Sequence, residues 1–333
     1  MRLFIIALLL FQFSSCKQEP QLVTLSGEAL GTGYSVQFYS SERFDVVNKF
    51  DSTIAAINKS MSTYQPDSDI SRINAGDTTV IVDTMFKEVL ALSRKVYNAT
   101  GGYYDPTVGI LVNAYGFGPG KPLNVLDSVV LDSLRNYVGL DKISLSATGK
   151  IQKENSAVYL DFNSIAKGYC IDRIGKMLEQ NGVKNYLVEL GGELLASGIN
   201  LDKKQPWRVG IENIDAPIND RGYTAAVELD NKGMAGSGNY RKFRVDSLTG
   251  QRFVHTVNPI NGLAEKSDIL SSTVIASTCA EADAFATAFM ALGLEKSKKV
   301  LEKHQDIEAY FIYATVDSSA VYMSKGFKNF LVN

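Results

Sequence analysis

The sequence is poor in histidine and shows almost no excess of charge. His255 and His304 are its only histidines, which excludes a zinc or iron centre built mainly from imidazole ligands. The formal net charge of -2 among 333 residues gives no electrostatic reason to expect nucleic acid as a partner. Hydrophobic residues at 45% and charged residues at 21% are typical of a globular protein, and the length allows one large or two medium domains.

The N-terminal segment is the part of the chain whose pattern does not predict a folded domain. Arg2 precedes an apolar run from Leu3 to Phe13, followed by Ser14-Ser15-Cys16. This run is too short for a membrane span and is typical of a secretory signal. Two small residues before a cysteine resemble a bacterial lipobox, in which Cys16 is lipidated; a plain signal peptide with an incidental cysteine is the alternative. We expect residues 1–15 to be the signal peptide, 16–21 a tether and 22–333 one domain.

Cysteine is also scarce. Besides Cys16 the chain holds Cys170 and Cys279, and both fall in segments with helical patterns. An exported protein could pair them, but two separate buried thiols are the expected state.

Residues 160–172 are the stretch around which the chain is organised. They follow a short apolar run, residues 157–160, that predicts a strand, and they open a predicted helix that ends at Asn181-Gly182. Asn163 and Ser164 are both residue types that cap a helix. With Asp161 and Lys167 nearby, this helix start suits a phosphate group and a hard cation; a capped surface helix is the alternative.

A second polar pair lies in an otherwise apolar helix predicted over residues 277–293. Asp283 and Thr287 are four residues apart, so both side chains lie on one helix face. A buried carboxylate without a partner is costly, and carboxylate and hydroxyl oxygens suit a hard ion such as magnesium. A carboxylate that bonds only to backbone is the alternative.

The remaining pattern alternates helices and strands without a repeat or a clear linker. Further helices are predicted at residues 44–60, 83–99 and 295–304. Strands are predicted at residues 23–25, 34–39, 186–190, 194–198, 207–212, 224–229, 243–246, 252–257, 270–276, 308–315 and 321–323.

Three familiar motifs fail at one or two positions each. Residues 31–36 lack the third glycine of a dinucleotide-binding turn, and residues 115–122 lack the first glycine and the hydroxyl of a phosphate-binding loop. Ala235 stands where a nucleophile elbow needs glycine. The sequence therefore shows no Ser-His-Asp hydrolase.

Several motifs, taken in order, resemble one family, the FAD:protein FMN transferases (ApbE family). They are Ser62-Thr63-Tyr64 with residues 68–74, Tyr104-Asp105-Pro106-Thr107-Val108-Gly109, Asp161-Phe162-Asn163-Ser164-Ile165-Ala166-Lys167-Gly168, Glu189-Leu190-Gly191-Gly192-Glu193, His255-Thr256-Val257-Asn258-Pro259 with Gly262, and Ala282-Asp283-Ala284 with Thr287. Together they extend from about Gly27 to Gly293.

The resemblance implies an α+β fold, with mixed sheets, packed helices and a flavin cleft between two halves of one compact domain. It implies magnesium-dependent transfer of FMN from FAD to a threonine of an acceptor protein, with release of AMP. The family's flavin contacts fall on Leu30, Tyr64, Tyr103, Tyr104, Asp105, Asp161, Lys167 and Val257, and its metal ligands fall on Ser164, Asp283 and Thr287.

The resemblance also implies chemical roles for individual residues. Tyr64 and Tyr104 offer rings for stacking, and Lys167 adds a charge to the pyrophosphate. His255 is a candidate base for the acceptor hydroxyl, or else it holds the turn before Pro259. We expect a lipid-anchored protein on a bacterial membrane, facing the periplasm, with a redox-type membrane or exported protein as acceptor. An FAD pyrophosphatase that gives FMN and AMP and a non-catalytic flavin-binding lipoprotein are the alternatives.

Overall fold

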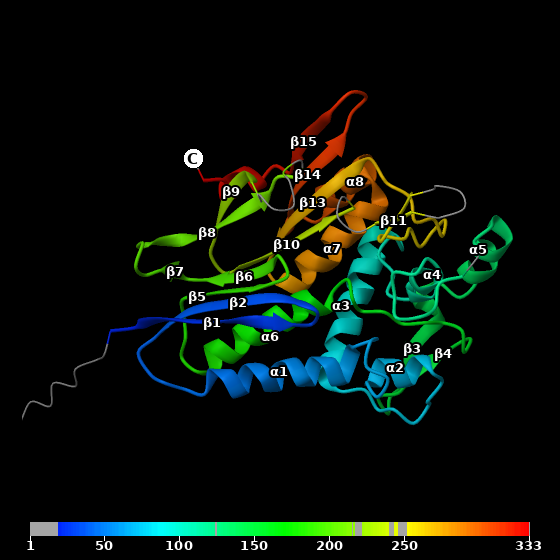
Figure 1. Ribbon diagram of the computed structural model, residues 1–333, viewed down its shortest axis with the longest axis horizontal. Coiled ribbons are helices and arrows are strands. Elements are labelled where there is room, and N and C mark those ends of the chain that lie inside the picture. The colour runs from blue at the N-terminus through cyan, green and yellow to red at the C-terminus, as the bar shows by residue number, and fades with distance from the viewer. Residues whose placement is uncertain are drawn as a thin grey trace, which may run out of the picture.

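A computed structural model describes residues 19–123, 125–214, 216, 222–239, 243–245 and 252–332. Its centre is an eight-stranded sheet with the strand order β1-β2-β5-β6-β10-β13-β14-β15, in which every neighbouring pair is antiparallel (Figure 1). The strands are β1 (Gln21–Ala29), β2 (Thr32–Ser40), β5 (Tyr186–Leu190), β6 (Glu193–Ser197), β10 (Lys232–Gly238), β13 (Ile269–Ala276), β14 (Glu308–Ala314) and β15 (Ser319–Met323).

Helices cover one face of this sheet and form the main core with it. They are α1 (Val46–Met61), α3 (Thr84–Thr100), α6 (Ala166–Gln180), α7 (Cys279–Leu292) and α8 (Leu294–Lys303). Val36, Val188 and Val274 point from the strands into the same apolar cluster as Ile171 and Phe285 from the helices. In Figure 1, α1 and α6 lie along the sheet below β1, β2 and β5.

A smaller sheet covers the opposite face. It contains β7 (Ile199–Asn200), β8 (Gln205–Glu212) and β9 (Tyr223–Leu229). Trp207 on β8 packs with Tyr39 and Leu194 of the large sheet. Because side chains alternate along a strand, Tyr39 and Phe38 serve the two different cores.

Short elements complete the fold near the C-terminal end of α3, where residues 101–108 follow the helix. These are α2 (Asp69–Asn74), α4 (Gly109–Ala114), α5 (Ser128–Arg135), β3 (Ile143–Leu145), β4 (Ile151–Lys153), β11 (Phe243–Val245) and β12 (Arg252–Val254), with a 3-10 turn at Leu140–Lys142. A second 3-10 turn, Phe327–Phe330, lies elsewhere, against β9 and β14. Leu111 and Tyr115 pack with Val257 in a third apolar cluster, which ties α4 to the segment after β12.

The mixed helix and strand architecture that the sequence predicts is confirmed. The predicted helices at 44–60, 83–99, 277–293 and 295–304 correspond to α1, α3, α7 and α8. Phe86, Val89 and Val96 face inward from α3 as their spacing predicts. The strands predicted in the second half of the chain are also present, with boundaries that differ by a few residues.

Two local predictions are wrong. Residues 157–160 do not form a strand; Tyr159 makes one isolated bridge to Val108. The helix start is also misassigned, because α6 begins at Ala166, after Ile165, and no side chain caps it. Neither Asn163 nor Ser164 caps the helix, since the Asn163 side chain donates to Thr63 and the Ser164 hydroxyl donates to Tyr104. Both side chains hold neighbouring segments instead.

The predicted signal peptide and the first half of the predicted tether, residues 16–18 with Cys16, lie outside the described residues. Within the described part of the chain, no helix combines the length and the apolar character that a membrane crossing requires. Cys170 and Cys279 are both buried and free, as the sequence predicts.

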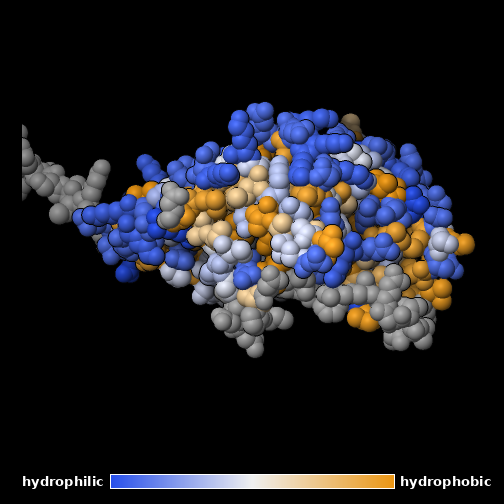
Figure 2. Space-filling model, turned by 90° about the horizontal axis from the view of Figure 1, so that it is seen from above, coloured by the Kyte–Doolittle hydropathy of each residue, from blue (hydrophilic) through white to orange (hydrophobic). Residues whose placement is uncertain are grey.

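Figure 2 shows one face of the molecule, on which hydrophilic residues cover one end and the upper margin while hydrophobic residues gather across the middle.

Candidate functional site

One large cleft, of about 1280 Å³, brings the predicted site residues together. Every predicted site residue that falls within the described part of the chain lines this cleft: Leu30, Tyr64, Tyr103, Tyr104, Asp105, Asp161, Ser164, Lys167, His255, Val257, Asp283 and Thr287. They come from segments that are widely separated in the chain. The cleft lies where the β1–β2 and β5–β6 turns end beside β10, and where α6 and α7 approach the sheet.

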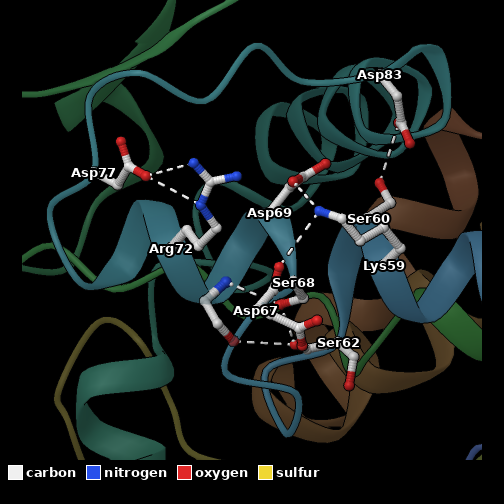
Figure 3. A network of polar contacts seen from close by, with 10 residues as sticks. Lys59, Ser60, Ser62, Asp67, Ser68, Asp69, Arg72, Asp77 and Asp83 are labelled. Carbon is white, nitrogen blue, oxygen red and sulfur yellow. Dashed lines mark hydrogen bonds and ion pairs between the residues drawn. The ribbon is translucent and has the colours of Figure 1, made fainter.

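The loop that carries Tyr64 is held by hydroxyl groups. Ser68 and Ser71 both donate to the backbone oxygen of Ser62, at 2.6 and 3.1 Å. Ser68 also caps α2 by accepting from the Ser71 N–H. Figure 3 shows this network, including the ion pair between Lys59 and Asp69. The serine-rich motif therefore fixes the loop, while 61% of the Tyr64 surface remains exposed at the cleft.

The same loop is joined to the central stretch by amide side chains. The Asn74 amide donates to the backbone oxygen of Leu160 and accepts from the Leu160 N–H, both at 2.8 Å. The Asn163 amide donates to the Thr63 hydroxyl at 3.2 Å. The two Asn74 bonds satisfy the backbone groups of Leu160 that a neighbouring strand would otherwise bond, so this end of the segment needs no strand partner.

Two buried acids in the cleft wall bond to the backbone. Asp105 accepts from the N–H and hydroxyl of Thr107 and from the N–H of Leu140. Burial raises the pKa of Asp105 to about 6, although these bonds act in the opposite direction. Asp161 accepts from the Asn163 N–H at 2.7 Å, and burial raises its pKa as well. The bonds that Asp105 accepts join Thr107 to Leu140 and fix this part of the cleft wall.

The two tyrosines predicted to stack differ in exposure. Tyr104 is only 2% exposed and its ring lies in the main core, whereas Tyr64 is 61% exposed; of the two, only Tyr64 has a ring that a ligand could stack on. The Tyr104 hydroxyl lies 3.4 Å from the Ser164 hydroxyl and 3.4 Å from the Ser93 hydroxyl. Tyr103 is partly exposed, and the Lys296 ammonium lies 4.4 Å from its ring centre.

Helices α6 and α7 touch because glycine stands at the contact. A Cβ atom on Gly168 would lie 2.5 Å from the backbone oxygen of Cys279. The Gly168 N–H donates to Oδ2 of Asp283 at 3.2 Å. Asp172, one turn later on α6, accepts from the N–H groups of Cys279 and Ala280 at 2.8 and 2.9 Å. Asp172 thus caps α7 from the neighbouring helix and fixes the position of Asp283.

A cluster of three charges lies at the centre of the cleft. Lys167 forms an ion pair with Oε1 of Glu193. Burial lowers the pKa of Lys167, but the charges of Asp283 and Glu193 outweigh this and raise it overall. Burial raises the pKa values of Glu193 and Asp283, more than Lys167 lowers them. Two acids against one base leave this wall with an excess of negative charge when all three are ionised.

Glu193 is the site residue that the sequence reasoning missed. Its side chain is buried, and its Oε2 atom has no hydrogen-bond partner in the part of the chain that the structure describes. The motif Glu189-Leu190-Gly191-Gly192-Glu193 contained the signal, because Gly191 and Gly192 both have positive φ and form the tight β5–β6 turn. That turn places Glu193 opposite Lys167.

The predicted metal ligands fit a hard cation by donor type. Ser164, Asp283 and Thr287 line the same cleft and offer only oxygen atoms, the ligands that magnesium prefers. Asp283 is 5% exposed, which makes a compensating positive charge valuable. Among the described residues, no group of three or more His, Cys, Asp or Glu side chains could hold a metal. A cation bound here would therefore take hydroxyl groups beside one or two carboxylates as its ligands.

His255 and Val257 line the cleft just after β12. The turn that follows is closed by the Asn258 backbone, which donates to Leu263 at 2.9 Å and accepts from Gly262 at 2.8 Å. Leu30 occupies the β1–β2 turn with φ of 49°, and Gly31 follows with φ of 75°.

The far wall of the cleft was predicted only as sheet. It contains Arg208, Gly210, Glu212 and Tyr223 from the β8–β9 hairpin, and the side chains of Ser35, Gln37 and Glu189 from the large sheet. Tyr223 is 69% exposed. An alternating strand pattern does not distinguish a cleft-facing side chain from a solvent-facing one, so these residues gave no functional signal.

Comparison with known proteins gives one consistent result. The sequence model of the ApbE family matches residues 30–311. A FAD:protein FMN transferase of Haemophilus influenzae is 34% identical over 95% of this chain and 93% of the relative, and that of Escherichia coli K12 is 31% identical over 100% and 97%. The flavin transferase ApbE structure from Vibrio cholerae has a TM-score of 0.83 and 31% identity, covering 94% of this chain and 100% of its own. The chain belongs to the ApbE family.

Proposed function

We propose that this protein transfers FMN from FAD to a hydroxyl group of an acceptor protein and releases AMP. The observation that carries the proposal is the single cleft in which Lys167, Asp283 and Tyr64 meet, in a chain whose relatives are named FAD:protein FMN transferases. The acceptor oxygen forms a bond to the FMN phosphorus while the bond from that phosphorus to the AMP oxygen breaks. The hydroxyl proton leaves to a base.

We assign the acceptor hydroxyl to threonine and the cation to magnesium. Ser164, Asp283 and Thr287 would hold the ion, and its charge would offset the charge on the pyrophosphate. The Gly168 N–H, which donates to Oδ2 of Asp283 at 3.2 Å, helps to hold this carboxylate in place. This assignment is supported by the oxygen-only donor set and by the burial of Asp283.

Other residues of the chain orient the nucleotide. Lys167 is fixed by Glu193, so its ammonium group stays in the cleft and can donate to phosphate oxygens. Tyr64, held by the serine network but widely exposed, offers a ring face for the flavin or the adenine. His255 at the cleft wall is the group that we assign as base for the acceptor hydroxyl.

The alternative reaction uses water in place of the acceptor and gives FMN and AMP. We prefer the transfer reaction, because the cleft is larger than the 300–1,000 Å³ typical of a site for one small ligand. A storage protein for flavin would not need the charged cluster of Lys167, Glu193 and Asp283 beside a hydroxyl pair.

One experiment tests these alternatives. The full-length chain is incubated with FAD, magnesium and a peptide library with threonine at the centre, and the peptides are analysed by mass spectrometry. Peptides that gain one FMN, together with released AMP, support the transferase. AMP and free FMN without a modified peptide would support the pyrophosphatase, and FAD that stays intact would support flavin storage. A sample with EDTA in place of magnesium tests the metal.

The location is a separate proposal. We propose that lipidation of Cys16 anchors the protein to a bacterial membrane, where it faces the periplasm and modifies a redox-type membrane or exported protein. Its support is the sequence Ser14-Ser15-Cys16 after a short apolar run. A Cys16→Ala variant should move to the soluble fraction and still transfer FMN. A variant that remains in the membrane fraction would contradict this anchor.

A further inference from the structure

Strand β10 extends further than its neighbour β6. In the ladder, β6 pairs with β10 only at residues 232–234, because the chain turns back into β5 at Gly191-Gly192. On its other side β10 continues to pair with β13 up to Gly238. Among the described residues, no strand pairs with the remaining edge of β10 at residues 235–238. The large sheet therefore has a gap beside the β5–β6 turn, along residues 235–238 of β10, which we call the notch.

This notch is part of the cleft. Gly236, Ser237 and Gly238 line the same cavity as Lys167 and Asp283. Gly236 is exposed, and no atom lies within 4 Å of the position that a Cβ atom would take there. Backbone N–H and C=O groups on an open strand edge can bond a further strand, and among the described residues no ladder uses this edge.

The two faces of β10 pack against different elements, so a segment bound in the notch would have two different sides. Ala235 packs in the main core with the helices, whereas Met234 packs on the opposite face with Trp207 of β8. Helix α7 packs directly on β10, since a Cβ atom on Gly233 would lie 2.3 Å from the Cys279 nitrogen. A strand beside this edge would therefore point alternate side chains toward α7 and toward β8.

We propose that the acceptor protein binds in the notch as an extended segment that adds a strand to the free edge of β10, with its threonine facing α7. The inference rests on the proposed function and names how its protein partner is held. The threonine hydroxyl then lies on the side of Asp283 and Thr287. The flanking side chains of the segment point toward β8, where Gly236 and Gly238 contribute no side chain.

This mode of binding sets the chemistry of the partner. Main-chain hydrogen bonds supply the affinity, and the alternate side chains supply the selectivity. The acceptor segment should be free to extend, as a loop or a terminus is, and should carry no proline at the positions that donate to β10. It should also tolerate variation at the residues that face away from α7.

The test uses a threonine peptide that the full-length chain modifies, taken from the threonine-centred library. A series of peptides is made with one backbone N-methyl group each, at successive positions around the threonine. N-methylation removes one donor, so positions that pair with β10 should lose modification at least tenfold and the positions between them should change less than twofold. The readout is the fraction of peptide that carries FMN.

The outcomes separate this inference from the proposed function. A modified peptide whose N-methylated forms show no alternation, because all are tolerated or all are lost, would overturn strand addition alone. The absence of any modified peptide, in a protein that still binds FAD, would overturn the proposed function and this inference with it.

Proline variants test the same edge from the protein side. Of the neighbours Gly236 and Ser237, one directs its N–H to β13 and the other to the notch. Of Gly236→Pro and Ser237→Pro, the variant that loses its bond to β13 should have a lower melting temperature. The other should keep the wild-type melting temperature and FAD binding, but the fraction of peptide that it modifies should fall at least tenfold. Ala320→Pro and Val321→Pro on the edge strand β15, outside the cleft, are the matched controls. Wild-type modification by both β10 variants would contradict the inference.

Discussion

The N–H of Gly168 donates to Oδ2 of Asp283 at 3.2 Å, and this bond joins the first turn of α6 to the second turn of α7. It requires the two helices to lie closer than most side chains permit. The absence of a side chain at position 168 is therefore a condition for the position of the Asp283 carboxylate.

A methyl group at position 168 should separate the helices. In Gly168→Ala the new Cβ atom would lie 2.5 Å from the Cys279 oxygen and 2.8 Å from the Ala280 Cα atom, both of them backbone atoms. We expect a loss of roughly 1–3 kcal/mol in the free energy of unfolding, measured by urea denaturation. Gly33→Ala, whose Cβ atom would have only an ordinary contact at 3.8 Å, is the control. Equal stability of the two variants would show that α7 can move away without cost.

Asp283→Asn should impair metal binding while preserving shape. The carboxylate charge is what a hard cation depends on, so the rise in melting temperature with added magnesium should shrink in the variant and FMN transfer should fall by orders of magnitude. High magnesium should restore part of the activity. Asp132→Asn, at an exposed carboxylate on α5, should behave as wild type. Overlapping magnesium titrations of Asp283→Asn and wild type would rule out Asp283 as a ligand.

Tyr64→Ala should weaken FAD binding. Its ring is 61% exposed on a loop that is held independently of the ring, so the loop should survive the change. Loss of one stacked face costs about 1 kcal/mol, which corresponds to a rise in Kd of about fivefold, measured by flavin fluorescence. Tyr64→Phe keeps the ring and should bind as wild type. An unchanged Kd in Tyr64→Ala would make Tyr64 part of the loop scaffold only.

Asp172 should make stability depend on pH. Burial raises its pKa to about 7, although it accepts from the Cys279 and Ala280 N–H groups. Between pH 5 and 7 the folded state keeps a proton that the unfolded state, with a pKa near 3.8, has lost. Stability should therefore fall as the pH rises through this window, by up to about 1.4 kcal/mol per unit.

The comparison with Asp172→Asn isolates this effect, since the other titrating groups are common to both proteins. The free energy of unfolding of the wild type, minus that of the variant, should decline from pH 5 to 7 and then level off. A flat difference across this range would mean that the carboxylate is already ionised at pH 5 in the folded protein.

Much of the site was predictable because its residues lie in motifs with short spacings. Asp283 and Thr287 belong to one helix face, and Tyr64 lies between Ser62 and Ser68, whose side chain bonds locally to the Ser62 backbone. The sequence could not show which distant residue would pair with Lys167. Glu193 reaches it through a two-glycine turn, and only the antiparallel pairing of β5 with β6 sets that position.

The failures of the sequence reading have physical causes as well. Strand β10 was missed because Gly233, Gly236 and Gly238 make it look like a loop, whereas Gly233 is what lets α7 pack on the sheet. Residues 157–160 have a strand-like composition, but the Asn74 side chain takes the bonds at Leu160. A side chain that replaces a strand partner leaves no periodic pattern to detect.

The assembly of the cleft from segments as distant as Leu30 and Thr287 links ligand binding to the folding of the whole chain. A proteolytic fragment that lacks either the first hairpin or α7 cannot form the cavity, so it should not retain part of the FAD affinity. Because the ligand is held only by the complete fold, FAD should stabilise the protein against global unfolding by RT ln(1 + [FAD]/Kd). Hydrogen exchange in the innermost strands should then slow when FAD is added, far from any atom that the ligand touches.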